Sequence, residues 1–225
     1  DAGEGILERT EWLGVVNQIS FPQLQGTLID GISSAVDIAP SFARETPSPT
    51  GDSPILLINE AANAIGQGKA QVALIVGAEA LRTAGMRLAD TATKSNVKKG
   101  PYPERAPVNP EPRFAYGLKT PTDVYPLFEN AARNVFGQTL AEAQAEAGLI
   151  WSGRSSVAAN TPSAWIRKEK SAAEVVHATP QNRPIAFPYT KFQVANAAVN
   201  QGAAVIVTSL AVAREAGIPD ERIIY

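Results

Sequence analysis

Runs of apolar residues along the chain predict four extended segments. Glu11–Asn17 is apolar and rich in β-branched residues, and Phe42–Thr46 is a short extended stretch that is followed by two prolines. Gln71–Val76 and Ala203–Ser209 are continuously apolar, without the polar alternation of a half-exposed strand. We therefore expect these last two segments to be strands that are covered on both faces.

Two helices alternate with these strands. Gln23–Val36 carries apolar residues at helical spacing, which predicts an amphipathic helix. A second helix has Pro54 at its first position, after Asp52 or Ser53 as the N-cap, and runs to about Ile65. Because this second helix is apolar on nearly every side, we expect it to be buried in the middle of a layered domain.

The middle of the chain differs in character from both ends. Pro101–Pro112 contains five prolines in twelve residues, which excludes regular structure. Helices are predicted over Thr122–Phe136 and from Leu140 onward, where Thr139 and Glu142 fit a capping box. We interpret this region as a helical insertion with loops on both sides.

The order of the elements predicts an α/β fold that carries this insertion. A last short helix is expected over Leu210–Ala216. Strand, helix and strand, with a long excursion before the final strand, make one α/β domain. We place the core in residues 1–84 and 189–225 and the inserted subdomain in residues 85–188.

Composition limits the chemistry that the chain can carry. Its 225 residues include 20 Lys+Arg and 22 Asp+Glu, and the net charge of −2 gives no electrostatic reason to expect nucleic acid. Zero cysteines exclude disulfides, thiolate nucleophiles and zinc–sulfur sites, and we expect neither a metal nor a cofactor. The apolar runs are too short to span a bilayer, and no secretory signal is visible. We therefore expect a cytoplasmic protein without membrane contact. Because the chain begins with Asp1 and its only methionine is Met86, we also expect a processed or incomplete polypeptide.

Several motifs have a simpler explanation than catalysis. Gly66-Gln-Gly68-Lys69 follows a helix and lacks the other residues of a phosphate loop, so we interpret it as a helix C-cap. His177 lies in a polar connecting segment without a local partner, and Ser152–Ser156 belongs to the helical insertion. Lys98–Lys99 and Arg167–Lys170 are interpreted as solvated surface, with contact to a ligand phosphate as the alternative.

Gly51, at the head of the apolar helix, is the most informative single position. Free N–H groups and a partial positive charge at a helix N-terminus lower the pKa of a thiol and stabilise a developing oxyanion. A catalytic nucleophile would benefit from this place, but the sequence has glycine there. The alternative is that Gly51 only serves the tight turn into the helix.

Two blocks of sequence stand out by their order and spacing. They are TGDSPILLINEAANAIGQGKAQVALIVGAEALR (Thr50–Arg82) and RPIAFPYTKFQVANAAVNQGAAVIVTSLAVAREAGIP (Arg183–Pro219). Together they resemble the thiolase superfamily, specifically bacterial thiolase-like proteins of the sterol-carrier-protein type that are often labelled acetyl-CoA acetyltransferase. The resemblance implies the N-terminal half of a thiolase-type layered α/β/α core, with a loop subdomain that covers the coenzyme A.

The sequence departs from this family in two ways. The family's reactive cysteine falls at or next to Gly51, so condensation through an acyl-cysteine is not expected. The chain also stops where thiolases are about half finished, and the C-terminal half with the family's histidine is absent. A first strand that the resemblance places before Asp1 is absent as well.

The resemblance also implies binding and contact residues. Tyr189, Lys191 and Asn196 would line the acyl-CoA channel, with Lys191 beside a phosphate or the pantetheine. The alternative is that Phe187–Tyr189 only packs the loop subdomain on the core. Thiolases dimerise near the nucleophile turn, so Phe42–Thr46 is the candidate contact of a homodimer.

The leading functional hypothesis is a cysteine-less thiolase-like protein that binds an acyl-CoA thioester as its substrate. It would make or break a C–C bond next to the thioester carbonyl, as an acyltransferase or a retro-aldolase. Related cysteine-less members act as aldolases on CoA-linked steroid-type side chains beside a small hotdog-fold or OB-type partner. The alternative is a non-catalytic CoA-binding or structural subunit of a larger assembly. A thiolase with Ser48, Thr50 or Ser53 as nucleophile ranks third, because nothing near them in sequence could act as a base.

Overall fold

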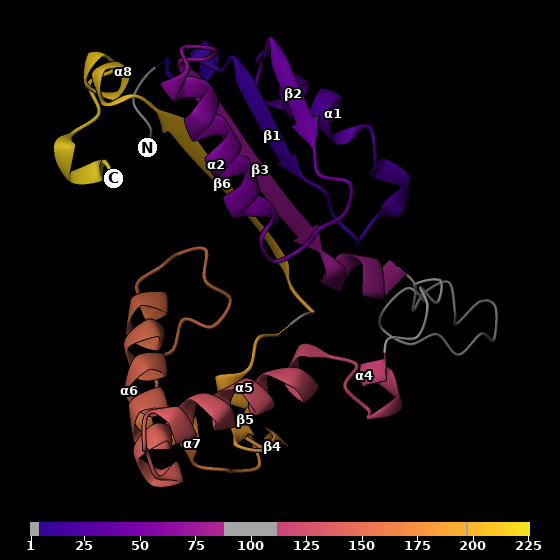
Figure 1. Ribbon diagram of the computed structural model, residues 1–225, viewed down its shortest axis with the longest axis vertical. Coiled ribbons are helices and arrows are strands. Elements are labelled where there is room, and N and C mark those ends of the chain that lie inside the picture. The colour runs from indigo at the N-terminus through magenta and orange to yellow at the C-terminus, as the bar shows by residue number, and fades with distance from the viewer. Residues whose placement is uncertain (1–4, 88–111, 197) are drawn as a thin grey trace. The chain divides into compact units, whose positions relative to one another are not determined.

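The computed structural model describes residues 5–87, 112–196 and 198–225, which fall into two compact units (Figure 1). The first unit comprises Asp1–Tyr102 and Ala197–Tyr225, and the second unit comprises Pro103–Asn196. The boundaries expected from the sequence are 84/85 and 188/189. Lys98–Lys99 and the proline-rich stretch up to position 111 lie outside the described residues.

The first unit is built on a four-stranded sheet in the order β2-β1-β3-β6. The strands are β1 (Trp12–Val16), β2 (Phe42–Glu45), β3 (Val72–Ala80) and β6 (Asn200–Thr208). β1 pairs in parallel with both β2 and β3, whereas β6 runs antiparallel to β3. The four predicted extended segments are thereby confirmed as strands of one sheet.

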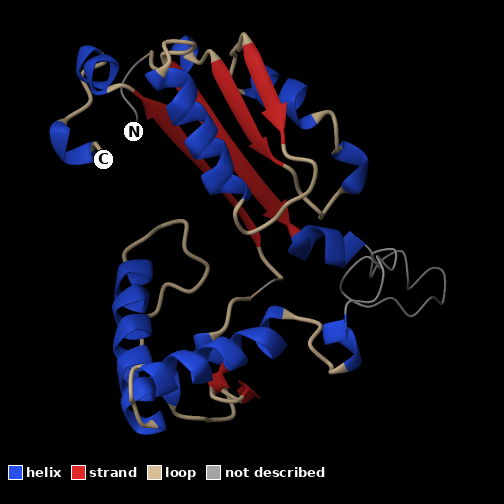
Figure 2. Ribbon diagram, viewed as in Figure 1, coloured by secondary structure: helices blue, strands red, loops and turns tan. Residues whose placement is uncertain are grey.

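Helices cover both faces of this sheet (Figure 2). The helical elements of the first unit include η1 (Leu7–Arg9), η2 (Pro22–Leu24), α1 (Leu28–Ala35), α2 (Ser53–Gly66), α8 (Leu210–Glu215) and η4 (Asp220–Arg222), and residues 81–87 after β3 are helical as well. The helix predicted over Gln23–Val36 is split into η2 and α1. Gly26 lies between them with a φ of 80°, a left-handed conformation that interrupts a right-handed helix.

Two apolar clusters hold the layers together. On one face, Leu57 and Ala61 of α2 pack against Trp12 and Ile75 of the sheet. On the other face, residues of α1 pack against Leu13, Val15, Ile38 and Leu74. The alternation of side chains along β1 and β3 sends successive residues to opposite clusters, and this produces the layered α/β arrangement that was expected.

Two expectations about burial are wrong. The side chains of Ile55 and Leu56 on α2 are 66% and 42% exposed, so this helix buries only the side that faces the sheet. The predicted strand at Ala203–Ser209 is the edge strand β6, where Val205 is 46% exposed. In the described structure the sheet covers only one side of α2, and the edge strand β6 has a neighbouring strand on one side only. The apolar composition of these two segments therefore overestimated how much of their surface is buried.

The second unit consists of helices and a small hairpin. Its elements are α4 (Pro112–Ala115), α5 (Pro121–Val135), α6 (Leu140–Ala159), α7 (Ala172–Val176), β4 (Pro184–Ala186), β5 (Tyr189–Thr190) and η3 (Lys191–Gln193). The two predicted helices are confirmed, as is the capping box in which Thr139 accepts a hydrogen bond from the Glu142 backbone N–H. Ser152–Ser156 lies within α6, as expected.

Candidate functional site

The carboxyl ends of the parallel strands define the first candidate site. β1, β2 and β3 run in parallel, so their C-terminal ends meet at one edge of the sheet. Helix α2 follows β2 in the chain, and its N-terminus therefore starts at the same edge. In open α/β sheets, ligands bind outside this edge. We call this place the carboxyl edge, and define it by Asn17–Ser20, Thr46, Thr50–Ser53 and Glu79.

The loop after β1 is fixed from both sides at the carboxyl edge. The Asn17 backbone N–H donates to Thr46 Oγ1 at 2.9 Å. On the other side, Glu79 at the end of β3 accepts the backbone N–H of Ile19 at 2.7 Å and that of Ser20 at 3.1 Å, together with the Ser20 hydroxyl. Glu79 thus anchors this loop, a role that its place in the Thr50–Arg82 block did not reveal.

The turn that leads into α2 is held by its own side chains. The Thr50 backbone N–H donates to Ser53 Oγ at 3.0 Å, and the Thr50 hydroxyl donates to Asp52 Oδ1 at 2.5 Å. The hydrogen bond from the Thr50 hydroxyl holds the pKa of the Asp52 carboxyl below its usual range. A carboxylate with a lowered pKa is a weak base, so the turn offers the Thr50 and Ser53 hydroxyls no strong activating group.

Gly51 sits in this turn with open space in front of it. A Cβ built on Gly51 meets no other atom within 4 Å, and its φ lies outside the left-handed region that favours glycine. The turn therefore does not need glycine for its backbone shape. The first turn of α2 also includes Pro54, which has no N–H, so this helix terminus has one backbone donor fewer for an anion.

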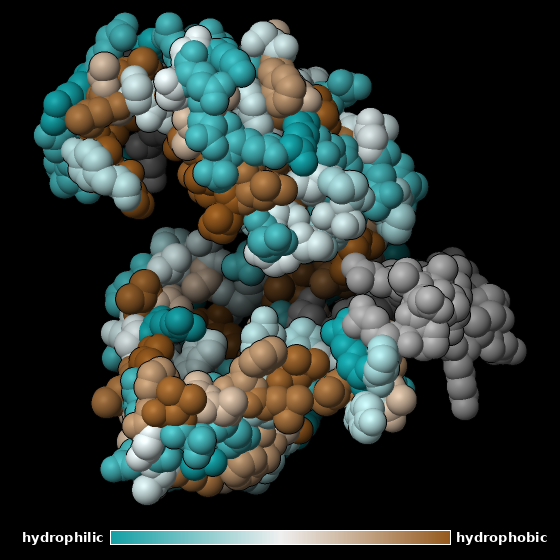
Figure 3. All heavy atoms as spheres, viewed as in Figure 1, coloured by the Kyte–Doolittle hydropathy of each residue, from teal (hydrophilic) through white to brown (hydrophobic). Residues whose placement is uncertain are grey.

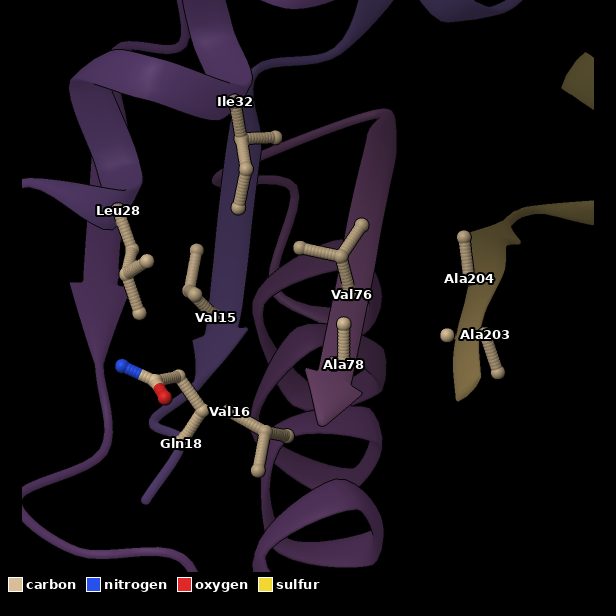
Figure 4. Close-up of a pocket in the computed structure, with 11 residues that line it drawn as sticks. Val15, Val16, Gln18, Leu28, Ile32, Val76, Ala78, Ala203 and Ala204 are labelled. Atoms are coloured by element: carbon tan, nitrogen blue, oxygen red, sulfur yellow. The ribbon is translucent and has the colours of Figure 1, made fainter. Parts of the chain in front are cut away.

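An apolar groove of about 430 Å³ reaches the carboxyl edge along the α1 side of the sheet (Figure 4). Gln18 from the loop after β1 contributes the polar side chain of its lining. The other lining residues are apolar or glycine: Val15, Val16, Leu28, Ile32, Val76, Gly77, Ala78, Gly202, Ala203 and Ala204. Because no charged side chain lines the groove, it offers no partner for phosphate groups.

The residues expected to line an acyl-CoA channel lie in the second unit. The hydroxyl of Tyr189 donates to Glu129 Oε2 at 3.2 Å. Burial, together with the charge of Glu129, raises the pKa of Tyr189 to about 12. Lys191 and Asn196 are exposed, and the Lys191 backbone N–H donates to the Arg183 carbonyl at 2.9 Å. Gly51 belongs to the first unit, so a site shared by all four residues stays a prediction.

A buried asparagine positions the segment that carries Tyr189 and Lys191. Asn182 is 1% exposed, and its amide nitrogen donates to the carbonyls of Glu174, Val175 and His177 at 3.0, 2.8 and 3.0 Å. Its Oδ1 accepts the backbone N–H of Phe192 at 2.9 Å. Asn182 cannot be recognised from the sequence, because a single asparagine in a loop gives no pattern that would reveal such a network.

Other motifs take the places that the sequence indicated. Gly68 ends α2 with a φ of 67°, and the Lys69 backbone N–H donates to the Ala64 carbonyl at 2.9 Å, which confirms the helix C-cap. His177 follows the end of α7 and is exposed. Among the described residues, no group of three or more His, Asp or Glu side chains is arranged to hold a metal ion. No described helix is both long and apolar enough to cross a membrane.

Comparisons with known proteins identify the fold. No family model and no curated protein matches the sequence. Among solved structures, a monomeric SCP2-thiolase-like protein type 1 from Mycobacterium smegmatis matches with a TM-score of 0.63 and 25% sequence identity, over 96% of this chain. The Ltp2-ChsH2(DUF35) aldolase matches with a TM-score of 0.58 and 17% identity, over 90% of this chain.

The chain therefore has an SCP2-thiolase-like fold, as the resemblance in its sequence implied. It spans 40% of the length of the first of these proteins and 46% of the second. That the turn at Gly51 corresponds to the family's nucleophile position stays a prediction, and the sequence supplies no cysteine there.

Proposed function

We propose that this chain is part of a cysteine-less thiolase-like protein that binds a CoA thioester at the carboxyl edge. The observation that carries the proposal is the turn at Gly51. It lies at the N-terminus of a 14-residue helix, beside the ends of three parallel strands, with open space where a nucleophile would stand. The thioester carbonyl oxygen would accept hydrogen bonds from backbone N–H groups in this turn.

The absence of cysteine favours a reaction without an acyl-enzyme intermediate. A retro-aldol cleavage of a 3-hydroxyacyl-CoA meets this condition. A base takes the proton of the 3-hydroxyl group, and the bond between C2 and C3 breaks to leave a carbonyl compound and the enolate of the shorter thioester. The enolate then takes up a proton at C2. The turn at Gly51 would stabilise the enolate oxygen, and the base would come from outside this chain.

The second unit would supply contacts to the rest of the substrate. The exposed ammonium group of Lys191 is suited to a phosphate or to the pantetheine, and Tyr189 and Asn196 would lie along the acyl-CoA channel. One of the similar structures is described as an Ltp2-ChsH2(DUF35) aldolase. This supports a further protein subunit as a partner of the present chain.

Calorimetric titration of the 225-residue chain with CoA and with acetyl-CoA tests the proposed site. Gly51→Leu should fill the open space at the turn and weaken acetyl-CoA binding at least tenfold. Gly66→Leu is the matched control, because Gly66 ends the same helix and a Cβ there also meets no atom within 4 Å. The proposal fails if the unmodified chain binds neither compound, or if the two variants bind acetyl-CoA equally.

A second candidate is a non-catalytic CoA-binding or structural subunit. The sequence has no cysteine, and its single histidine is exposed beyond the end of α7. An activity assay distinguishes the two candidates. The native protein, together with everything that co-purifies with it, is incubated with a 3-hydroxyacyl-CoA, and cleavage of this compound is measured. Release of a carbonyl compound would establish the aldolase, whereas binding without any release would support the non-catalytic subunit.

A further inference from the structure

Two exposed cations of the second unit lie opposite each other on its hairpin. On the face drawn in Figure 3, this unit carries hydrophilic as well as apolar side chains. Arg183 precedes β4 and Lys191 follows β5, and both are exposed. The hairpin pairs Pro184 with Thr190, and one step further along the Lys191 backbone N–H donates to the Arg183 carbonyl at 2.9 Å. This register makes Arg183 and Lys191 neighbours across the open end of the hairpin.

No acidic side chain of the described residues neutralises this pair of cations. Within those residues, neither Arg183 nor Lys191 forms an ion pair. Helices α5 and α7 contact the hairpin, but their carboxylates Glu129 and Glu174 are hydrogen-bonded to other residues. Like charges that lie opposite each other in an antiparallel pair are destabilising. An anion bound between the two cations would remove this repulsion.

Buried hydrogen bonds hold the backbone of both cations in place despite their repulsion. Asn182, which is 1% exposed, directly precedes Arg183. Its Oδ1 accepts the backbone N–H of Phe192, the residue after Lys191, at 2.9 Å. Thr190, the residue before Lys191, is also buried, and its hydroxyl donates to a carbonyl of α7 at 2.6 Å. Because the protein already fixes this backbone, an anion that binds here does not have to order it.

We propose that Arg183 and Lys191 together bind one phosphate group. A guanidinium group can donate two parallel N–H bonds to a phosphate, and an ammonium group adds another charge-assisted hydrogen bond. Inorganic phosphate and the phosphate groups of CoA are two sources of this chemistry. Binding of CoA by the pair rests on the function proposed above, whereas binding of inorganic phosphate does not. The inference adds Arg183 to Lys191 and makes the two side chains one site.

Inorganic phosphate is the first probe, and the amide resonances of the isotope-labelled 225-residue chain are the readout. The resonances of Arg183, Lys191 and Phe192 should shift with phosphate but not with chloride at the same ionic strength. The shift of the Phe192 amide should be lost in a double variant that carries Arg183→Gln and Lys191→Gln. Circular dichroism confirms that this variant is folded.

Calorimetric titration with CoA and with pantetheine, which has no phosphate group, is the second arm. The double variant should bind CoA about tenfold more weakly than the native chain, or weaker still, and pantetheine with unchanged affinity. Lys119→Gln is the matched control, because Lys119 is an exposed cation of the same unit that lies beside Asp123. This control variant should bind CoA like the native chain.

The two arms separate this inference from the proposed function. Dependence of either probe on the pair supports the inference and identifies the source of the phosphate. If CoA binds the native chain and the double variant equally, and phosphate shifts are equal as well, the inference is overturned while the proposed function stands. If only inorganic phosphate requires the pair and no CoA compound binds, the inference stands and the proposed function fails. A native chain that binds neither probe would overturn both.

Discussion

The indole of Trp12 lies over Gly14, two residues further along β1. A Cβ built on Gly14 would lie 2.5 Å from Trp12 Cζ3 and 3.4 Å from Leu57 Cβ of helix α2. The missing side chain at Gly14 thus leaves room for the indole between the sheet and α2. Trp12 in turn belongs to the apolar cluster that fixes α2, and with it the turn at Gly51, on the sheet.

Gly14→Ala should destabilise the first unit, because the added methyl group cannot fit without moving the indole. We expect a loss of about 1–3 kcal/mol in the free energy of unfolding, measured by denaturant titration. Gly31→Ala is the opposite control, since Gly31 lies in α1 and a Cβ there meets no atom within 4 Å. It should stabilise by up to about 1 kcal/mol. Equal effects of the two substitutions would contradict the packing described for Trp12.

Asn182→Asp should destabilise the second unit in a pH-dependent way. In the variant, a carboxylate oxygen would replace the amide nitrogen that donates to three backbone carbonyl oxygens. Because those oxygens repel a negative charge, the pKa of the new carboxyl group in the folded state would be raised above its unfolded value. The variant should therefore be most stable below about pH 4 and lose stability as pH rises through the raised pKa. At pH 7 the loss should exceed about 3 kcal/mol in the free energy of unfolding. Thermal unfolding between pH 3 and 7 measures it, and a loss that does not depend on pH would refute this account.

Glu174→Gln should lower the melting temperature of the second unit at neutral pH. The backbone N–H of Ser171, its hydroxyl and the Lys170 ammonium lower the pKa of Glu174 from 4.5 to about 2. Because the pKa of Glu174 is lower in the folded state than in the unfolded state, its carboxylate stabilises the folded state at pH values above the unfolded pKa. This stabilisation is lost as the pH falls toward 2. The difference between native chain and variant should thus be present at pH 7 and vanish near pH 2. Glu169→Gln, on an exposed neighbour, should show no such trend.

Gly51→Cys should be tolerated, and the pKa of the new thiol should be subject to two opposing effects. The N-terminus of α2 lowers the thiol pKa, whereas the charged Asp52 next to it raises that pKa. Adding Asp52→Asn should lower the thiol pKa by roughly half a unit, since two charges about 6 Å apart in water interact by a little under 1 kcal/mol. The pH dependence of alkylation by iodoacetamide measures both values. An identical thiol pKa in the single and double variants would argue against the carboxylate acting at this turn.

Local signals were the reliable part of the sequence. The capping box at Thr139 and Glu142, Pro54 in the first turn of α2 and Gly68 at its end each mark a helix boundary that the structure contains. These signals work because the backbone groups at a helix end are satisfied by residues close by in the chain. The helix predicted over Gln23–Val36 was interrupted at Gly26, whose left-handed conformation an apolar pattern does not reveal.

Contacts between distant parts of the chain could not be foreseen in this way. Glu79 accepts a hydrogen bond from Ser20, which lies 59 positions earlier in the chain. Asn182 donates hydrogen bonds to backbone carbonyls of α7 and accepts one from a backbone N–H of η3. Such networks depend on where tertiary structure brings single polar groups, and a lone glutamate or asparagine has no periodicity. The resemblance to thiolases includes the Thr50–Arg82 block, which contains Glu79, but it does not indicate what the Glu79 side chain does.

The sequence by itself determined the class of fold, the strands of the sheet and the position of the turn at Gly51, because apolar runs, caps and breakers are properties of neighbouring residues. Only the tertiary structure decided which apolar surface is covered. α2 and β6 have the composition of buried elements, yet Ile55 is 66% exposed and Val205 is 46% exposed in the described chain. Composition reports the tendency of a segment to leave water, whereas burial also requires a surface to pack against.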